Sequence, residues 1–83
     1  MKNKILVQLL VPDIEEKYDV FIPINKKIGN IILLLAKSVR ELDDNEQIKD
    51  TSCLYNRDTG VKYNPDLLII DSDIRNGTTL VLM

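Results

Sequence analysis

The chain has 83 residues and a formal net charge of −2; 45% of the residues are hydrophobic, 5% are aromatic and 29% are charged. This length suits one domain, and the hydrophobic content can fill one compact core, which excludes a disordered chain. Charges of both signs are mixed along the sequence without a basic stripe, so nucleic acid is not expected as a partner. The longest purely apolar run covers residues 31–36, far short of the roughly 20 residues that span a bilayer. We therefore expect a single cytoplasmic domain over residues 1–83 that meets a membrane only through a partner.

The first two predicted elements are the strands of a hairpin. In "KILVQLLVP" (residues 4–12) and "YDVFIPI" (residues 18–24), β-favouring residues alternate between two faces, as the period of a strand requires. Pro12 and Asp13 favour a turn, and a loop of about five residues is of ordinary length for a hairpin. Pro23 has no N–H to donate to a neighbouring strand, so it should mark the end of the strand or a free edge.

From Ile28 the apolar residues recur at steps of three and four, which predicts an amphipathic helix over residues 28–42. Asn25 is the expected N-cap of this helix. The acidic residues 43–46 should follow it in a solvated loop. The residues expected to face the core are Ile28, Ile31, Ile32, Leu35, Val39 and Leu42. The residues expected to face water are Lys37, Arg40 and Glu41.

Beyond the helix, the sequence predicts three short strands and the turns that connect them. The strands cover residues 51–56, 61–63 and 78–83. Gly60 suits the turn in "RDTG", because glycine adopts positive φ angles without strain, and Asn76-Gly77 makes the last turn. Between these turns, "DLLIIDSDI" is expected to form a compact crossover that buries Leu68 or Ile69.

The predicted order of elements is β-β-α-β-β-β, which indicates an α+β fold. A helix that lies across one face of a mixed sheet buries that face and leaves the other face open. The first and last strands should be parallel neighbours in the middle of the sheet. This is the β-grasp arrangement.

Residues with catalytic or ligand chemistry are few. The sequence has no histidine, so the usual general base is missing, and no histidine can activate the thiol of the single cysteine, Cys53. Asp71 and Asp73 supply only part of the oxygen shell of a hard cation, and we expect them to solvate the turn before Ile74. The single glycine of "RDTG" cannot build a phosphate-binding loop, and three glycines in the whole chain argue against nucleotide binding. We therefore expect no catalytic residue, metal or cofactor, and a function in recognition.

Alternation along the strands assigns each side chain to the helix-covered face or to the open face. The residues expected under the helix are Ile5, Val7, Leu9, Val20, Ile22, Leu54, Leu80 and Leu82. Their neighbours in the strands then point to the open face, which is mainly apolar here, whereas an open sheet face is normally polar. The candidate protein-interaction residues on it are Leu6, Leu10, Phe21, Tyr55, Val81 and Met83, with Gln8 and Cys53 beside them.

Several large apolar groups on one face form the kind of patch that marks a binding surface for another protein. Two other interpretations stay open. In the first, these residues are scattered apolar groups of an ordinary surface. In the second, another chain binds by pairing with an exposed strand edge. A weak homo-oligomer is also compatible with such a face.

Three stretches resemble a known protein family: "YDVFIP" (residues 18–23), "IGNIILLLAKSV" (residues 28–39) and "IRNGTTLVLM" (residues 74–83). In this order and spacing they are similar to ubiquitin-like domains and, more closely, to the YukD-like (EsaB-like) ubiquitin-like proteins of WXG-type, or type VII, secretion systems in Gram-positive bacteria. The resemblance implies a ubiquitin-like β-grasp fold and an accessory role with protein partners in the secretion machinery. It also implies binding through the open sheet face, since ubiquitin binds most of its partners through the comparable face.

The sequence closes with Leu82-Met83 in place of the diglycine through which modifiers and sulfur carriers act. Members of the resembled family likewise end at the last strand and are not thought to be conjugated, so we expect a non-conjugating interaction module. Two alternatives remain: an unrelated β-grasp protein-binding module, and a modifier or sulfur carrier that lacks its diglycine tail. An enzyme is disfavoured by the missing bases and ligands.

Overall fold

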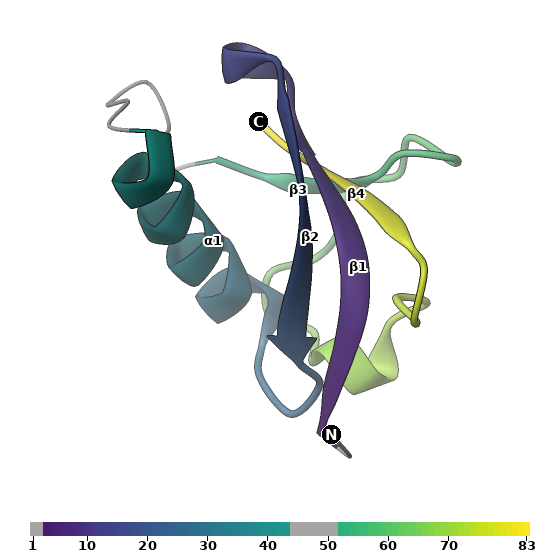
Figure 1. Ribbon diagram of the computed structural model, residues 1–83. Coiled ribbons are helices and arrows are strands. Elements are labelled where there is room, and N and C mark those ends of the chain that lie inside the picture. The colour runs from purple at the N-terminus through teal and green to yellow at the C-terminus, as the bar shows by residue number, and fades with distance from the viewer. Residues whose placement is uncertain (1–2, 44–51) are drawn as a thin grey trace.

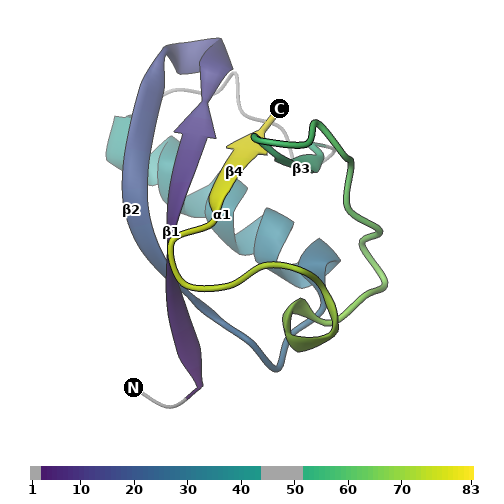
Figure 2. The same ribbon diagram turned by 90° about the vertical axis from the view of Figure 1, so that its right-hand side faces the viewer.

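The computed structural model describes residues 3–43 and 52–83 (Figure 1). Its elements in chain order are β1 (Lys4–Val11), η1 (Pro12–Ile14), β2 (Glu16–Pro23), α1 (Ile28–Asp43), β3 (Leu54–Asn56), η2 (Ile69–Asp71) and β4 (Thr79–Leu82). The strand order is β2-β1-β4-β3; β1 and β4 run parallel in the centre, and the two outer pairs are antiparallel. α1 crosses one face of the sheet and leaves the other uncovered (Figure 2). The predicted α+β, β-grasp arrangement is confirmed.

The β1–β2 hairpin follows the predicted alternation along both strands. Its loop is a 3-10 turn in which the Glu15 N–H donates to the Pro12 carbonyl at 3.0 Å. β2 begins at Glu16, earlier than its predicted start at Tyr18, and ends at Pro23. Because β2 is also an edge strand of the sheet, both positions predicted for Pro23 apply.

The core lies between α1 and the covered face of the sheet. Among the residues predicted under the helix, the buried ones are Val7, Leu9, Ile22, Leu54, Leu80 and Leu82, and the half-buried ones packed against them are Ile5 and Val20. The helix contributes Ile28, Ile31, Ile32, Leu35, Ala36 and Val39. The predicted alternation is therefore confirmed on every strand that was used to assign the two faces.

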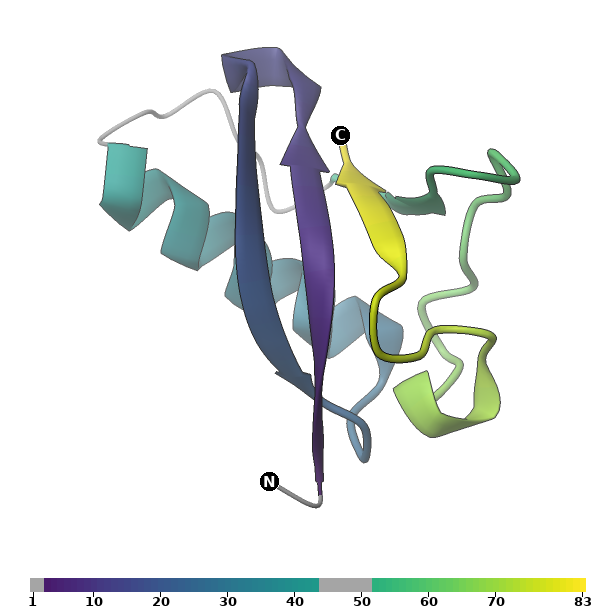
Figure 3. The same ribbon diagram turned by 45° about the vertical axis from the view of Figure 1, so that its right-hand side comes forward.

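The predicted inward position of Leu42 is wrong, since its side chain is 70% exposed. The C-terminal turns of α1 extend past the edge strand β2, so the sheet no longer covers them (Figure 3). Periodicity gives the direction in which a side chain leaves the helix, but not the point at which the sheet beneath it ends. Arg40 also differs from the prediction, because it is half-buried, whereas Lys37 and Glu41 are exposed as expected.

The start of α1 is held by backbone contacts and not by the predicted N-cap, Asn25. The helix begins at Ile28, whose N–H donates to the Leu67 carbonyl at 2.8 Å, and the next N–H, of Gly29, donates to the Pro65 carbonyl at 2.8 Å. Carbonyl groups of the crossover thus satisfy helix donors that a capping side chain usually serves. A Cβ on Gly29 would lie 3.2 Å from Pro65, so glycine permits this close approach. Neither α1 nor the shorter helical segments of the described residues have the length and apolarity that crossing a membrane demands.

The predicted pair of strands after the helix is shorter than expected. β3 covers only Leu54–Asn56, and the predicted strand at residues 61–63 is reduced to a single bridge between Lys62 and Tyr55. The described chain therefore has four strands where five were predicted. The Asn56 carboxamide explains the tight turn between them: its Oδ1 accepts from the N–H groups of Asp58 and Thr59, which closes the chain back on itself within a few residues.

The other turn predictions are confirmed. Gly60 and Gly77 have φ angles of 72° and 88°, in the left-handed region that glycine tolerates. In the crossover it is Ile69 that is fully buried, while Leu68 is half-buried. The predicted acidic loop after the helix lies outside the described residues, apart from Asp43, which ends α1.

Candidate interaction surface

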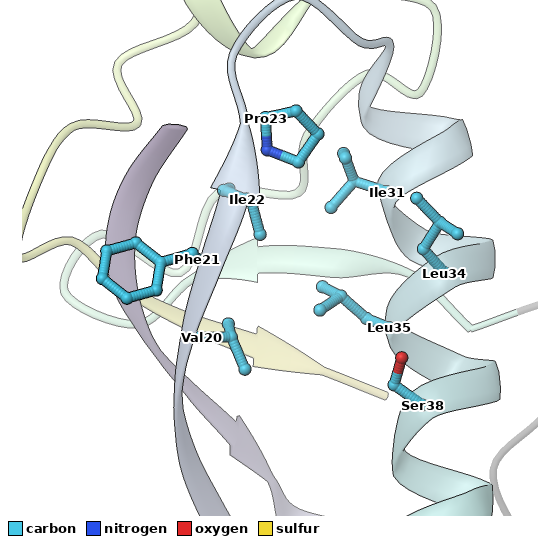
Figure 4. Close-up of a pocket in the computed structure, with 8 residues that line it drawn as sticks. All are labelled: Val20, Phe21, Ile22, Pro23, Ile31, Leu34, Leu35 and Ser38. Atoms are coloured by element: carbon cyan, nitrogen blue, oxygen red, sulfur yellow. The ribbon is translucent and has the colours of Figure 1, made fainter. Parts of the chain in front are cut away.

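The open face of the sheet is turned toward the viewer in Figure 3. The structure places all six candidate residues on this side: Leu6, Phe21 and Met83 are exposed, and Leu10, Tyr55 and Val81 are half-buried. Figure 4 shows the alternation directly, since Phe21 points away from α1 while its neighbours Val20 and Ile22 point toward it.

Three of the candidates form one continuous row. Leu10 of β1 is opposite Val81 of β4, and Val81 is opposite Tyr55 of β3. Directly opposite residues of neighbouring strands project from the same face, so these three side chains lie side by side. We refer to Leu10, Val81 and Tyr55 as the central row. Lys17, opposite Leu10, and Lys62, bridged to Tyr55, lie at its two ends.

Met83 lies next to the central row, toward the end of β4. Its N–H donates to the Cys53 carbonyl at 3.0 Å, and its carbonyl accepts from the Cys53 N–H at 2.8 Å. Two residues that exchange both hydrogen bonds are directly opposite in an antiparallel pair. Met83 and the half-buried Cys53 therefore form the row next to Val81 and Tyr55, on the same face.

A polar row separates the other two candidates from this group. Gln8 is opposite Asp19 of β2 and Thr79 of β4. Beyond it, Leu6 is opposite Phe21. Leu6 and Leu10 are four residues apart in one strand, or about 13 Å. The six candidates thus form two apolar groups and not the single patch that the sequence predicted, and the central row with Met83 is the larger group.

A hydrogen-bonded tyrosine holds the β3 end of the sheet against the crossover. The hydroxyl of the buried Tyr63 donates to the Asp73 carboxylate at 2.6 Å and accepts from the Asn56 side-chain amide at 3.1 Å. The pKa of Tyr63 is raised from 10.0 to about 12; burial is the largest cause, and the hydrogen bond to Asp73 is the next. Asp73 was predicted only to solvate the turn before Ile74, so this role of Asp73, and Tyr63 itself, were missed from the sequence. Residues 3–43 and 52–83 contain no cluster of three or more metal-ligating side chains.

A second apolar feature lies between the edge strand β2 and α1, and the sequence did not predict it. We refer to it as the β2–α1 groove. It has a volume of about 370 Å³ and is lined by Val20, Phe21, Ile22, Pro23, Ile31, Leu34, Leu35 and Ser38 (Figure 4). Leu34 is 52% exposed there. The uninterrupted apolar run at residues 31–36 was the available signal, because it holds more apolar residues than one buried helix face uses.

Comparison with known proteins gives a clear result for the fold. No model of a protein family matches the chain, and neither does any curated protein sequence. Among solved structures, the EccD5 ubiquitin-like domain from Mycobacterium xenopi has a TM-score of 0.77 at 18% identity, with 96% of this chain and 92% of that one covered. The ubiquitin-like domain of the Mycobacterium tuberculosis type VII secretion system protein EccD1 has a TM-score of 0.72 at 15% identity, with 95% and 96% covered.

A chain of the MycP5-free ESX-5 inner membrane complex has a TM-score of 0.78 at 18% identity, with 98% of this chain covered. The protein spans only 21% of that chain's length. At such identities the similarity is one of fold, and it shows that the protein has the ubiquitin-like fold that its sequence predicted.

Proposed function

We propose that this protein is a non-conjugating ubiquitin-like module that binds another protein through the central row, as a cytoplasmic accessory component of a type VII secretion system. One observation carries the binding role: three apolar side chains from three different strands lie side by side on the sheet face that α1 leaves open. We assign the module no enzymatic activity, cofactor or metal. Nucleic acid is not among the proposed partners, because the net charge is −2 and phosphate binding requires a basic surface.

The central row has the properties of an interface centre. Leu10, Val81 and Tyr55 are half-buried by their strand neighbours, so a partner that covers them orders few additional rotamers. The tyrosine offers a large apolar ring together with a hydroxyl, a combination that is enriched at interfaces. Lys17 and Lys62 at the ends of the row favour a partner that surrounds an apolar contact with acidic side chains.

The secretion system is proposed because two kinds of similarity agree. The sequence resembles the ubiquitin-like proteins of type VII secretion, and three similar structures belong to EccD ubiquitin-like domains or to an ESX-5 complex. The cheapest check is gene neighbourhood, where a secretion ATPase and WXG-type substrates are expected. The stronger one is affinity capture from the native cells followed by mass spectrometry, in which secretion-machinery proteins should be recovered. Reproducible recovery of unrelated complexes alone would contradict the assignment.

The non-conjugating role is proposed because the sequence resembles ubiquitin-like proteins of type VII secretion that are not thought to be conjugated. Leu82 is fully buried, and Met83 exchanges two hydrogen bonds with Cys53. Both residues are therefore held in the sheet. We expect no isopeptide-linked adducts in native cells. A ladder of such adducts on immunoblots that requires a free C-terminal carboxylate would refute this.

The binding role is tested by placing a charge in the central row. Leu10→Lys and Val81→Lys should each weaken binding of the captured partners by about 2 kcal/mol, or roughly thirtyfold in affinity, as expected for a contact at the centre of an interface. The matched control is Ile70→Lys, which changes an exposed apolar residue on η2, away from the sheet. Thermal melts of all three variants check that each one still folds. Retention of every partner by folded central-row variants would move the interface elsewhere.

A further inference from the structure

The hydrogen-bond pattern between β1 and β2 shows which backbone groups of the edge strand β2 are unpaired. In an antiparallel pair, residues alternate between those bonded to the partner strand and those whose N–H and C=O point away from it. The Ile24 N–H donates to the Asn3 carbonyl on the β1 side at 2.9 Å. The even-numbered residues of β2 are in step with Ile24, so they bond to β1. The odd-numbered residues Lys17, Asp19 and Phe21 therefore direct their N–H and C=O groups to the free edge.

The hydrogen bonds between β1 and β4 agree with this assignment of even- and odd-numbered residues. The Gln8 N–H donates to the Thr78 carbonyl at 3.0 Å, and the Leu6 carbonyl accepts from the Gly77 N–H at 2.8 Å. Even-numbered residues of β1 thus bond toward β4, which leaves the odd-numbered ones to bond β2. No other segment of the described residues pairs with the free edge of β2, because β2 is the last strand in the order. Such an edge is a template for an added strand.

The β2–α1 groove lies directly beside this edge. Its floor consists of the buried side chains of Ile22, Ile31 and Leu35, and the partly exposed Val20 and Leu34 stand on opposite sides of it (Figure 4). An added strand would place every second side chain over this floor, since side chains alternate between the two faces. The edge supplies hydrogen bonds and the groove supplies an apolar pocket, which are the two requirements of recognition by strand addition.

We propose that the free edge of β2, together with the β2–α1 groove, binds an extended segment of a partner protein as an additional strand, antiparallel to β2. The segment has aliphatic residues at the alternate positions that face the groove. At the intervening positions, it has a basic residue opposite Asp19 and an acidic residue opposite Lys17. Charge complementarity sets this pattern, because Lys17 and Asp19 are exposed on the same face of β2 and cross-strand pairs of opposite charge are favourable. Lys17 borders both this site and the central row, but the edge of β2 and the β2–α1 groove include none of Leu10, Val81 and Tyr55, and the partner segment is distinct from the partner proposed for the central row.

A second copy of the same chain fits the site poorly. If β2 pairs with its own copy so that Lys17 lies opposite Asp19, then Glu16 of one copy lies opposite Val20 of the other. The carboxylate of Glu16 would then face the apolar groove, which is unfavourable without a counter-charge. Registers that place aliphatic residues there instead lose the Lys17–Asp19 pairs. A different chain can satisfy both conditions, which is why we assign the site to a partner segment.

The direct test uses the whole 83-residue chain and a blocked synthetic peptide, Ile-Thr-Val-Lys-Ile-Glu. In the proposed register its lysine lies opposite Asp19 and its glutamate opposite Lys17. Titration followed by amide NMR should shift the Lys17, Asp19 and Phe21 signals and protect those amides from hydrogen exchange. The peptide with the two charges exchanged, Ile-Thr-Val-Glu-Ile-Lys, should bind about tenfold more weakly, because two attractive pairs become repulsive. In the double variant Lys17→Glu/Asp19→Lys, the preference between the two peptides should reverse.

Two neighbouring residues of α1 give a matched pair for the groove. Leu34 and Leu33 are 52% and 48% exposed, so neither replacement should unfold the domain, but only Leu34 lines the groove. Leu34→Glu should weaken the first peptide at least about tenfold, the effect of losing one buried leucine contact, whereas Leu33→Glu should leave its affinity unchanged.

The possible outcomes separate cleanly. Shifts confined to β2 and the facing side of α1, with the Leu34-specific loss and the reversal of peptide preference, support the site. Shifts centred on the central row overturn it, as does the absence of binding by either peptide. Concentration-dependent dimerisation through β2 without peptide would assign the edge to a second copy and would also overturn it. None of these results depends on the central row, so the proposed function is tested separately.

Discussion

At the scale of single residues, the most informative group is one that the sequence did not single out. Tyr63 lies between Asn56 at the end of β3 and Asp73 in the crossover, and it hydrogen-bonds to both. Its short 2.6 Å bond to Asp73 joins two segments that β-sheet pairing leaves unconnected. A hydrogen bond to a charged group typically contributes more than a neutral one, although Asp73 is exposed and water competes for its carboxylate.

Tyr63→Phe should therefore cost about 1 kcal/mol in the free energy of unfolding, measured by urea denaturation at neutral pH. The pKa of Tyr63 is raised from 10.0 to about 12, so the folded state favours the protonated hydroxyl. Its contribution is complete below pH 10 and is lost as the pH rises toward 12. The stability difference between wild type and Tyr63→Phe should shrink across this window. A difference that stays constant would mean that folding does not raise the pKa of Tyr63.

At the scale of elements, the sequence predicted α1 within one residue at its end, but not what its ends contact. Its start is held by the carbonyls of Pro65 and Leu67, which approach from the crossover, and no local pattern reveals such a partner. Its end extends beyond the sheet (Figure 3), so the apolar stripe continues where no strand covers it. The wrong predictions for Asn25 and Leu42 arise because periodicity describes one element, whereas capping and burial depend on its neighbours.

A matched pair of substitutions in α1 measures where the covered part of the helix ends. Leu42→Lys should change the unfolding free energy by no more than about 0.5 kcal/mol, because Leu42 is 70% exposed and a cation near a helix C-terminus is favourable. Val39→Lys, one turn earlier, should cost about 3 kcal/mol or more, because Val39 is buried and its site holds no counter-charge for an ammonium group among the core residues. Equal losses from both substitutions would contradict the exposed position of Leu42.

At the scale of the whole molecule, the strand alternation and the switch to helical period were sufficient to predict the topology. Val7, Leu9, Leu80 and Leu82 lie inward as expected, and β1 and β4 are parallel central neighbours. The sequence could not predict which open-face residues meet, because that depends on the register between strands far apart in the chain. The register divides the predicted patch at Gln8, and the groove beside β2 exists only once α1 is docked on the sheet.

The assignment of the two faces can be tested on the intact fold, because a one-residue shift of strand register would exchange them. Val7→Asp places a carboxylate in the core, where Val7 is 1% exposed, and it should unfold the domain. Phe21→Asp replaces a side chain that is 55% exposed and points away from α1 (Figure 4), so it should alter the unfolding free energy by only about 0.5 kcal/mol. Circular dichroism melts of both variants give the comparison, with Leu6→Asp as a second open-face control. Since Leu6 and Phe21 are opposite each other, they should behave alike, and unfolding of either as severe as that of Val7→Asp would mean that the open face of the sheet has been wrongly assigned.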